Sequence, residues 1–321
     1  MAVKSSGTLS FNTDIVGEFG GSTPHSLSEY YGVDSGVPSS GTIAFSDFYG
    51  ASNVVTATGG SSINGQTALK QIRTSSYISS GGTFQIPSNY WIWSDNVGVA
   101  ALIIDTPNCT VVNSGKIIGR GGNGRGHYQS LQNGGPAISV TAGGVTIRNM
   151  SGAYIAGGGG GGGGEGPGGT GGGGAGGGAG GDIRNRNGNS AGGAINARGE
   201  DGVGWLYGAV YGGQAGGSGG IYNYDSSGTW TRAAGGGRIL PGLTSDLQAV
   251  SGSQAPIRDG GGGGQAGGNG GGQGNSVWGG GGGGWGAAGG NYFSISGGSG
   301  GAAVSGSHTK GTWSGTVYGS S

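Results

Sequence analysis

Residues 157–181 read GGGGGGGGEGPGGTGGGGAGGGAGG, and this stretch decides the fold class of the chain. Glycine supplies 92 of the 321 residues, and further runs lie at 260–264 and 279–284. Ordering a backbone costs about 1–2 kcal/mol per residue and most for glycine, so such runs either stay disordered or are held by contacts between backbones. The segments between the runs are rich in tryptophan and tyrosine, which a flexible linker does not need.

Glycine can adopt an extended left-handed threefold helix that rises about 3.1 Å per residue and points its N–H and C=O groups outward. When such helices pack side by side, N–H···O and Cα–H···O bonds between neighbours pair those groups. We therefore predict a bundle of packed polyglycine type II helices over residues 157–304, in which glycine forms the core. Collagen is excluded, because the chain has eight prolines and no sustained glycine triplet.

Composition excludes several functions. The chain carries 14 basic and 14 acidic residues, so it lacks the basic footprint of a nucleic-acid-binding protein. It has no run of 18 apolar residues and no apolar signal core at Met1–Leu9, so we expect neither membrane insertion nor conventional export. The one cysteine, Cys109, lies in an apolar stretch and is predicted to be buried and structural.

Residues 54–156 have the pattern of short strands. Two stretches, Cys109–Gly122 and Gly144–Gly158, each give an alternating strand, a turn, a second strand and then glycine. Such recurrence is typical of successive coils of a right-handed parallel β-solenoid. An antiparallel sandwich is the alternative. The expected fold class is mainly β and irregular with almost no α-helix, a short solenoid-like or sandwich region followed by the glycine-helix bundle.

Two terminal segments complete the predicted organisation. Residues 1–53 hold seven Phe and Tyr residues but are expected to be too short for an independent core, which favours docking on a partner subunit over a floppy arm. Within them, Ser26–Glu29 is predicted to start one helical turn. Residues 305–321 alternate bulky and small side chains and are expected to close the structure as one more strand.

Several phrases resemble tail and fibre proteins of tailed bacteriophages. They are Ser39–Gly50 (SSGTIAFSDFYG), Glu18–Ser22 with Leu27–Tyr31, and the closing Thr312–Gly319 (TWSGTVYG). The glycine runs with aromatic insertions are also similar to the distal adhesins of T-even-like phages, whose tip is a sandwich of polyglycine type II helices. The N-terminal region departs from the attachment domain of those adhesins, so their mode of attachment does not carry over.

The resemblance implies a receptor-binding protein of the virion, at the tip of a tail or tail fibre. In T-even-like adhesins the segments between glycine runs contact an outer-membrane protein or a surface glycan, here taken as lipopolysaccharide. Carried onto this chain, those segments are 182–190, 194–211, 221–234, 238–259 and 291–296. Other tail or fibre subunits are expected to bind the N-terminal segment. The copy number stays open, with a homotrimer as one alternative.

Aromatic and arginine side chains in two of these segments are the candidate receptor-binding residues. Trp, Tyr and Arg dominate binding hot spots because they bury large rigid areas and keep a polar group, and aromatic faces suit sugar rings. The candidates are Arg198, Trp205, Tyr207, Tyr211, Tyr222, Tyr224, Trp230 and Arg232. The alternative is that these rings only pack on glycine helices, which is the interpretation we favour for Trp278 and Trp285 inside glycine runs.

No enzyme chemistry is predicted, and neither a cofactor nor a metal is implied. His25, His127 and His308 lie far apart and have no neighbouring Cys or His at metal-ligand spacing. A glycan-cleaving pair of carboxylates in the central region would have to use Asp95 and Asp105, which are ten residues apart on or beside apolar strands.

Other functions were weighed against the adhesin. Gly119–Gly126 lacks the Lys-Ser/Thr ending of a phosphate loop and is expected to be a tight turn. Ice binding is disfavoured, because the segments between glycine runs are irregular and charged. A non-catalytic structural spacer of the virion tail is the stronger alternative, and it predicts aromatic residues buried inside the bundle.

Overall fold

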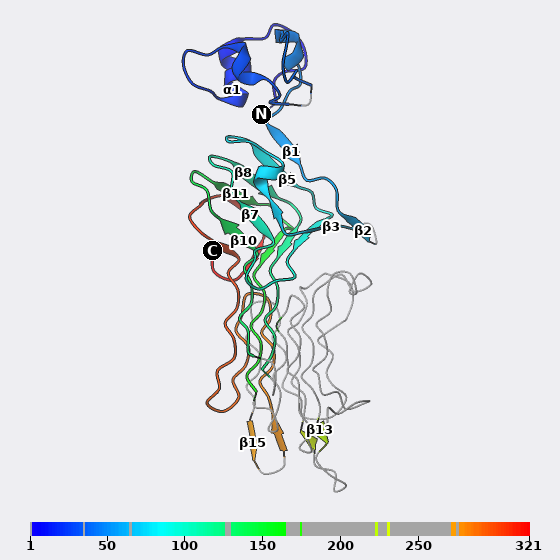
Figure 1. The fold of residues 1–321 in the computed structure, drawn as a ribbon, viewed down its shortest axis with the longest axis vertical. Helices are drawn as coiled ribbons and strands as arrows, with labels where there is room; N and C mark the ends of the chain where they lie inside the picture. The colour runs from blue at the N-terminus through cyan, green and yellow to red at the C-terminus, as the bar shows by residue number, and fades with distance from the viewer. Residues whose placement is uncertain are drawn as a thin grey trace.

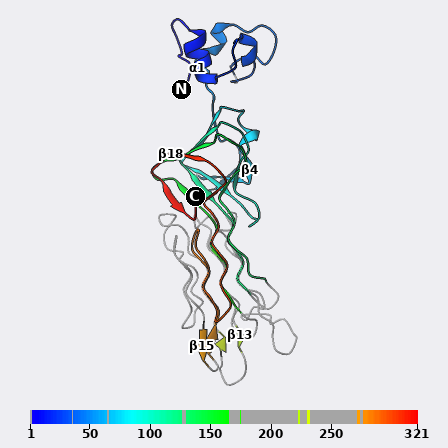
Figure 2. The ribbon, with the colours of Figure 1, turned by 90° about the vertical axis from the view of Figure 1, so that its left-hand side faces the viewer.

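The computed structural model describes residues 2–34, 36–63, 66–125, 130–164, 174, 222–223, 230–231, 271–273 and 276–321. They form an N-terminal lobe, a body of parallel strands and a set of extended glycine segments, arranged along one long axis (Figure 1). Figure 2 shows the lobe at one end and the glycine segments running to the other. The structure is mainly β, and its described residues include one short α-helix, α1 (Val16–Phe19).

The N-terminal lobe has a core of its own, which its length did not predict. Around α1 lie three turns of helix, η1 (Phe11–Ile15), η2 (Leu27–Tyr30) and η3 (Phe45–Phe48). Ile15, Tyr30 and Phe48 are buried together with small apolar residues, and the rings of Tyr30 and Phe48 meet edge to face at 6.2 Å. Each large aromatic side chain buries 150–250 Å², so a few of them suffice for a small core. The expectation that this segment is too short for a core is therefore wrong.

The central strands form three sheets, and successive coils of the chain add strands to these sheets in turn. The first sheet contains, in spatial order, β1 (Val54–Thr56), β5 (Thr83–Ile86), β8 (Thr110–Asn113), β11 (Thr146–Asn149) and β18 (Thr309–Trp313). The second contains β17 (Val304–Ser305), β10 (Ile138–Val140), β7 (Leu102–Ile104) and β4 (Ile72–Arg73), which leads into η4 (Thr74–Ser76). The third contains β19 (Thr316–Tyr318), β12 (Tyr154–Ala156), β9 (Lys116–Ile118), β6 (Tyr90–Trp93), β3 (Gln66–Lys70) and β2 (Ser61–Ile63).

All pairings within these three sheets are parallel except the β2–β3 hairpin. The two stretches that looked alike in sequence pair strand for strand, β8 with β11 and β9 with β12. This arrangement matches the solenoid-like prediction, and the antiparallel sandwich is wrong. The reason is that, apart from the β2–β3 hairpin, each strand pairs with the equivalent strand one full coil away and not with its predecessor along the chain.

Apolar side chains stack in rows inside the solenoid. Ile92, Ile117 and Ile155 occupy equivalent positions on successive coils of the third sheet and have no exposed surface. Cys109 lies in the same core, as expected, and burial raises the pKa of its thiol to about 11. Asn113 and Asn149 are the buried polar exceptions, and the Asn113 amide donates to Asn149 Oδ1 at 2.9 Å. Because the two side chains are hydrogen-bonded to each other, the chain turns at these residues without leaving their buried amide groups unsatisfied.

The long insertions all leave the solenoid at one corner, between a strand of the third sheet and a strand of the second. Residues 119–137 connect β9 to β10, and residues 157–303 connect β12 to β17. The second insertion carries two hairpins, β13 (Tyr222–Asn223) with β14 (Trp230–Thr231), and β15 (Gly271–Gln273) with β16 (Ser276–Trp278). Both hairpins lie at the end of the molecule opposite the N-terminal lobe (Figure 1).

Glycine forms the interior of the inserted region. Residues 157–164 are all buried, and every carbonyl from 157 to 163 accepts a backbone N–H from another segment. The donors belong to residues 119–125, 280–286 and 298–301. Gly119, Gly122 and Arg125 donate in turn to Ala156, Gly159 and Gly162, so this stretch is extended. The expected tight turn at 119–126 is wrong for residues 119–125, since each third N–H has a partner on a neighbouring segment.

The C-terminal stretch adds two strands where one was expected. β18 joins the first sheet beside β11, and β19 joins the third beside β12. Ser314 and Gly315 form the corner between them, and both donate their N–H to the Asn149 carbonyl. The alternation of bulky and small residues continues across this corner, so the sequence pattern alone did not reveal it. Residues 305–321 thus complete the solenoid begun by residues 54–156.

Trp285 fixes the glycine region against the solenoid. It lies in a turn between glycine segments and has no exposed surface. Its ring packs with Trp91, Ile118 and Ala156 on the outer face of the third sheet. The burial expected for Trp285 is observed, but its packing partners in this cluster belong to the third sheet and not to the glycine segments. The side chain of Trp278 is outside what the structure describes.

Candidate functional site

The end of the molecule opposite the N-terminal lobe carries hairpins that join glycine segments. In Figure 1 the hairpins labelled β13 and β15 both lie there, and the orange segment that ends nearby contains residues 291–296. An exposed loop on a rigid frame is the usual position for binding residues. We therefore take this end of the molecule as the candidate functional site.

Two of the eight predicted receptor-binding residues lie within the described backbone. Tyr222 and Trp230 belong to the stem of the β13–β14 hairpin, where Tyr222 pairs with Thr231 and Asn223 with Trp230. The structure thus brings the backbones of these two candidates together at the candidate site. The other six, Arg198, Trp205, Tyr207, Tyr211, Tyr224 and Arg232, lie outside the described residues, as do segments 182–190, 194–211 and 238–259.

Residues 291–296 form a small hairpin whose base is held firmly. Tyr292 and Ile295 exchange two backbone hydrogen bonds of 2.8 Å, and Gly297 N–H donates to Asn291 Oδ1 at 3.0 Å. Next to the base of this hairpin, Gly163 N–H donates to the Gly290 carbonyl at 2.9 Å. The hairpin is thereby tied to the central glycine run.

Phe293 at the turn of this hairpin was not among the predicted residues. Its side chain is 61% exposed, whereas the neighbouring Tyr292 is buried. The two rings meet edge to face with centroids 4.7 Å apart. Phe293 also adopts a positive φ of 47°, a conformation that costs about 1 kcal/mol or more for a bulky side chain. The sequence contains only a weak indication of this residue, namely a Tyr-Phe pair in a short segment between glycine runs.

Acidic side chains of the solenoid are engaged in separate places. Asp95 forms an ion pair with Lys70. Asp105 accepts from Arg73 Nη1 at 3.3 Å and from the N–H and hydroxyl of Ser75 at 3.0 and 2.9 Å. Burial acts to raise the pKa of Asp105, but hydrogen bonds outweigh it and hold that pKa below the usual 3.8. These contacts fix the corner at η4, and they do not set the two carboxylates up as a pair.

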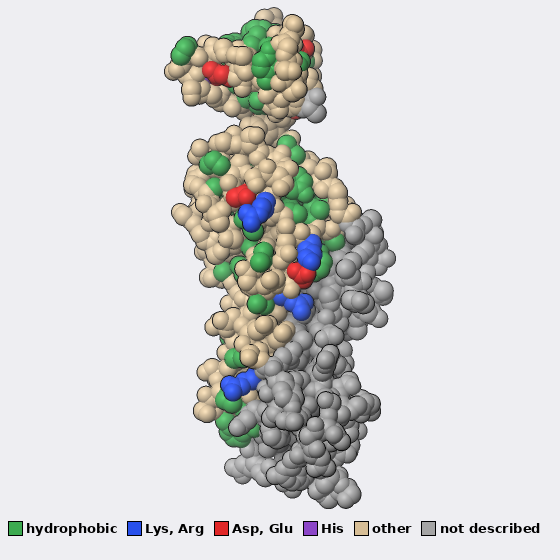
Figure 3. All heavy atoms as spheres, viewed as in Figure 1, with side chains coloured by type: hydrophobic (Ala, Val, Ile, Leu, Met, Phe, Trp, Pro, Cys, Tyr) green, Lys and Arg blue, Asp and Glu red, His purple; other side chains and the backbone are tan. Residues whose placement is uncertain are grey.

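Metal-binding and membrane-spanning features were sought in the described part of the chain. Within it, no group of three His, Cys, Asp or Glu residues is close enough to hold a metal ion. Nor does any described helix have the length and hydrophobicity to cross a membrane. His25 pairs with Glu29, His308 stacks on Trp313, and His127 lies outside the described residues. Figure 3 shows a few scattered charges, some of opposite sign side by side, on a mainly uncharged face.

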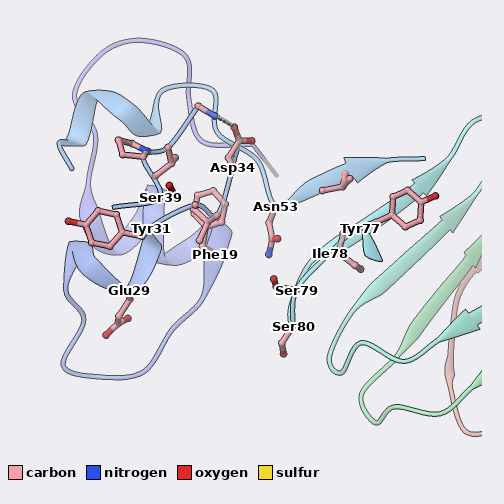
Figure 4. A pocket seen from close by; sticks show the side chains of 16 residues that line it. Phe19, Glu29, Tyr31, Asp34, Ser39, Asn53, Tyr77, Ile78, Ser79 and Ser80 are labelled. Carbon is pink, nitrogen blue, oxygen red and sulfur yellow. Dashed lines mark hydrogen bonds between the residues drawn. The ribbon is translucent and has the colours of Figure 1, made fainter. Parts of the chain in front are cut away.

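A cleft of about 830 Å³ separates the N-terminal lobe from the first coil of the solenoid. Phe19 and Asn53 lie on one side of it, and Ser79 and Ser80 lie on the other (Figure 4). Its two acidic residues already have partners, because Glu29 pairs with His25 and Asp34 accepts the N–H groups of Gly36 and Ser52. The cleft therefore marks the joint between lobe and solenoid.

Part of this chain matches a known protein family. Residues 51–205 match the model of a family described as phage tail fibre adhesin Gp38. This match, over somewhat less than half of the chain, supports a phage tail-fibre adhesin. The match runs from the first solenoid strand into the glycine region, and it confirms the resemblance drawn from the sequence and the location in the tail fibre of a virion.

One solved structure is also similar to this adhesin. It is the gp37-gp38 adhesin tip complex of the bacteriophage S16 long tail fibre, at 19% identity and a TM-score of 0.46 over 99% of each chain. A likeness at that level does not establish a shared fold. No curated protein matches the sequence.

Proposed function

We propose that this adhesin is the receptor-binding protein at the tip of the fibre, with its N-terminal lobe toward the fibre and its glycine-segment ends toward the host cell. The observation that supports this orientation is that the lobe and the hairpins lie at opposite ends of one elongated molecule (Figure 2). An adhesin that must reach the host surface needs its binding loops at the end opposite the one that is attached to the fibre. The host receptor is an outer-membrane protein or lipopolysaccharide.

The lobe is proposed to bind other fibre subunits. Most of its aromatic residues pack inside the lobe, but Phe45 and Tyr49 remain 40% and 42% exposed. Exposed apolar side chains close together favour a protein partner. The solved tip complex named above contains a gp37 partner, in keeping with this assignment. All strands of the described sheets come from one chain, and a homotrimer stays one alternative for the assembly.

The glycine segments are proposed to be packed polyglycine type II helices. Donors and acceptors along each segment recur every third residue: Gly158 and Gly161 donate to one neighbour, while Gly160 and Gly163 donate to another. A threefold helix distributes its groups to different sides with that period, whereas a strand alternates with a period of two. A Cβ added to most of these glycines would fall on a neighbouring carbonyl, which is the spacing that Cα–H···O contacts need.

Binding, and not catalysis, is proposed as the activity. The proposed contact residues are the eight aromatic and arginine candidates together with Phe293, which is the most exposed of the large apolar side chains in the described part of the chain. A rigid, solvent-exposed aromatic ring loses little entropy on binding and buries a large area. An exposed ring held at a positive φ on a fixed hairpin is consistent with such a role.

Exchange of the tip segments tests this function. Residues 194–211 and 221–234 would be replaced by those of an adhesin with a different host range, and phage adsorption to both hosts would be scored. Adsorption should follow the exchanged segments. A chain that carries the exchange, is present on the virion and retains its original host range would refute the assignment. Purified wild-type adhesin that neither binds host cells nor blocks adsorption would favour the structural spacer.

A further inference from the structure

The last strand of the first sheet leaves an open edge. β18 pairs with β11 on one side and lies last in the strand order of the sheet, and residues 309–312 are all exposed. An exposed edge strand presents unpaired backbone groups and readily pairs with another chain. Threonine favours strands, so this edge is well suited to such pairing. The molecule therefore needs a feature that keeps the edge unpaired.

A charged side chain occupies the core row at this edge. Phe84, Val111 and Ile147 lie at equivalent positions on successive coils of the first sheet, and none has exposed surface. The next member of the row, paired with Ile147, is Lys310. An apolar residue at this position would extend the hydrophobic row to the rim of the solenoid. Lysine instead places an ammonium group where the core is open to solvent.

The ammonium group of Lys310 is held at the rim. Its Nζ donates to the Ser321 carbonyl at 3.0 Å and to the Ser321 hydroxyl at 2.9 Å. It also lies 5.3 Å from the centre of the Trp313 ring, which packs against the main core and stacks with His308 at 6.1 Å. The aliphatic part of lysine can thus cover apolar surface while its charge stays in water.

We propose that Lys310 keeps this edge closed to a second copy of the chain. Two β18 edges are self-complementary, since antiparallel pairing about a twofold axis would join two first sheets into one. That pairing would enclose two Lys310 ammonium groups between two apolar rows. Removal of an ammonium group from water is costly even where it keeps hydrogen bonds, and a charge that points toward the core is a known protection of edge strands.

Removal of the charge tests the proposal. Lys310→Met keeps an aliphatic chain over the Trp313 ring, Lys310→Arg keeps the charge, and Lys70→Met removes a lysine from the outer face of the third sheet. The mass of each purified chain would be measured by sedimentation over a wide concentration range. We expect Lys310→Met to form dimers with an association constant at least tenfold above wild type. The other two variants should behave as wild type.

Hydrogen exchange locates the contact. In the Lys310→Met dimer, the amides of residues 309–312 should exchange at least tenfold more slowly than in wild type. The proposal is overturned if folded Lys310→Met has the wild-type mass, if Lys70→Met associates equally, or if the protected amides lie elsewhere. If Lys310→Met fails to fold, Lys310→Val replaces it, because its side chain continues the Val111–Ile147 row. The same results for mass and for amide protection then support or overturn the proposal.

Discussion

A single methyl group added to the central glycine run provides the sharpest test of how this adhesin is held together. A Cβ built on Gly161 would lie 2.0 Å from the carbonyl oxygen of Asn123, whereas real Cβ atoms essentially never approach a heavy atom within 3.0 Å. The obstacle is backbone, so no side-chain rotation can relieve it. Gly161→Ala must therefore separate two neighbouring segments by about 1 Å.

The cost of that separation follows from the hydrogen bonds that it strains. Gly122 N–H donates to the Gly159 carbonyl at 2.8 Å and Arg125 N–H donates to the Gly162 carbonyl at 2.9 Å, so these two bonds join the segments that must separate. Overpacking costs about 1–3 kcal/mol, and each weakened hydrogen bond costs about 0.5–1.5 kcal/mol. Alanine recovers about 0.4–1 kcal/mol by restricting the unfolded chain. We expect Gly161→Ala to lower the free energy of unfolding by about 2–5 kcal/mol.

Thermal unfolding followed by circular dichroism measures this effect. The control is Gly143→Ala, because a Cβ there would meet no heavy atom within 4 Å and Gly143 does not have a positive φ. Gly143→Ala should leave the midpoint unchanged or raise it slightly. If Gly161→Ala unfolds at the same temperature as this control, the close packing of glycine backbones does not stabilise the protein and the reasoning fails.

Four further substitutions or treatments give separate tests. Trp285→Ala removes a fully buried ring and should cost about 3–5 kcal/mol in denaturant unfolding, and a change below 1 kcal/mol would contradict its role in fixing the glycine region. Asp105→Asn should lower the unfolding midpoint most at neutral pH. The pKa of Asp105 in the folded protein lies below 3.8, so wild type should lose its stability advantage over Asp105→Asn only as pH falls through that lowered value. A difference in unfolding midpoint that does not change with pH would refute the ionic contribution. Cys109, with a buried thiol and a pKa of about 11, should resist alkylation at pH 8 until the chain unfolds, and rapid labelling of native protein would contradict this burial. Phe293→Asn suits the positive φ and should preserve or raise stability while weakening adsorption to host cells, so unchanged adsorption would remove Phe293 from the binding surface.

The parts of the fold that the sequence predicted are those in which one short pattern repeats. The strands β8 and β9 and their partners β11 and β12 were visible because both coils keep apolar residues at equivalent positions. Burial of Cys109 followed from its apolar neighbours in the same way. Local patterns of this kind require no knowledge of distant contacts.

Features that depend on distant contacts escaped prediction. The stretch 119–125 is extended because its N–H groups find acceptors at residues 156–162, and nothing within the stretch itself indicates those partners. The N-terminal core likewise depends on Ile15, Tyr30 and Phe48, which are spread over the lobe without a helical or strand period. Phe293 was missed because its importance lies in exposure and backbone conformation, and composition reports neither.

The position of the insertions gives the adhesin two regions with opposite tolerance to substitution. At the glycine segments, a side chain on Gly158 or Gly160 would collide with the backbone of a neighbouring segment, so these positions cannot change without loss of stability. At the hairpin ends, a side chain such as Phe293 projects into solvent and contributes little to the packing. Because both long insertions leave the solenoid at the same corner, changes at their ends do not reach the three sheets. We therefore expect substitutions at the exposed hairpin ends to alter binding while leaving the unfolding midpoint almost unchanged.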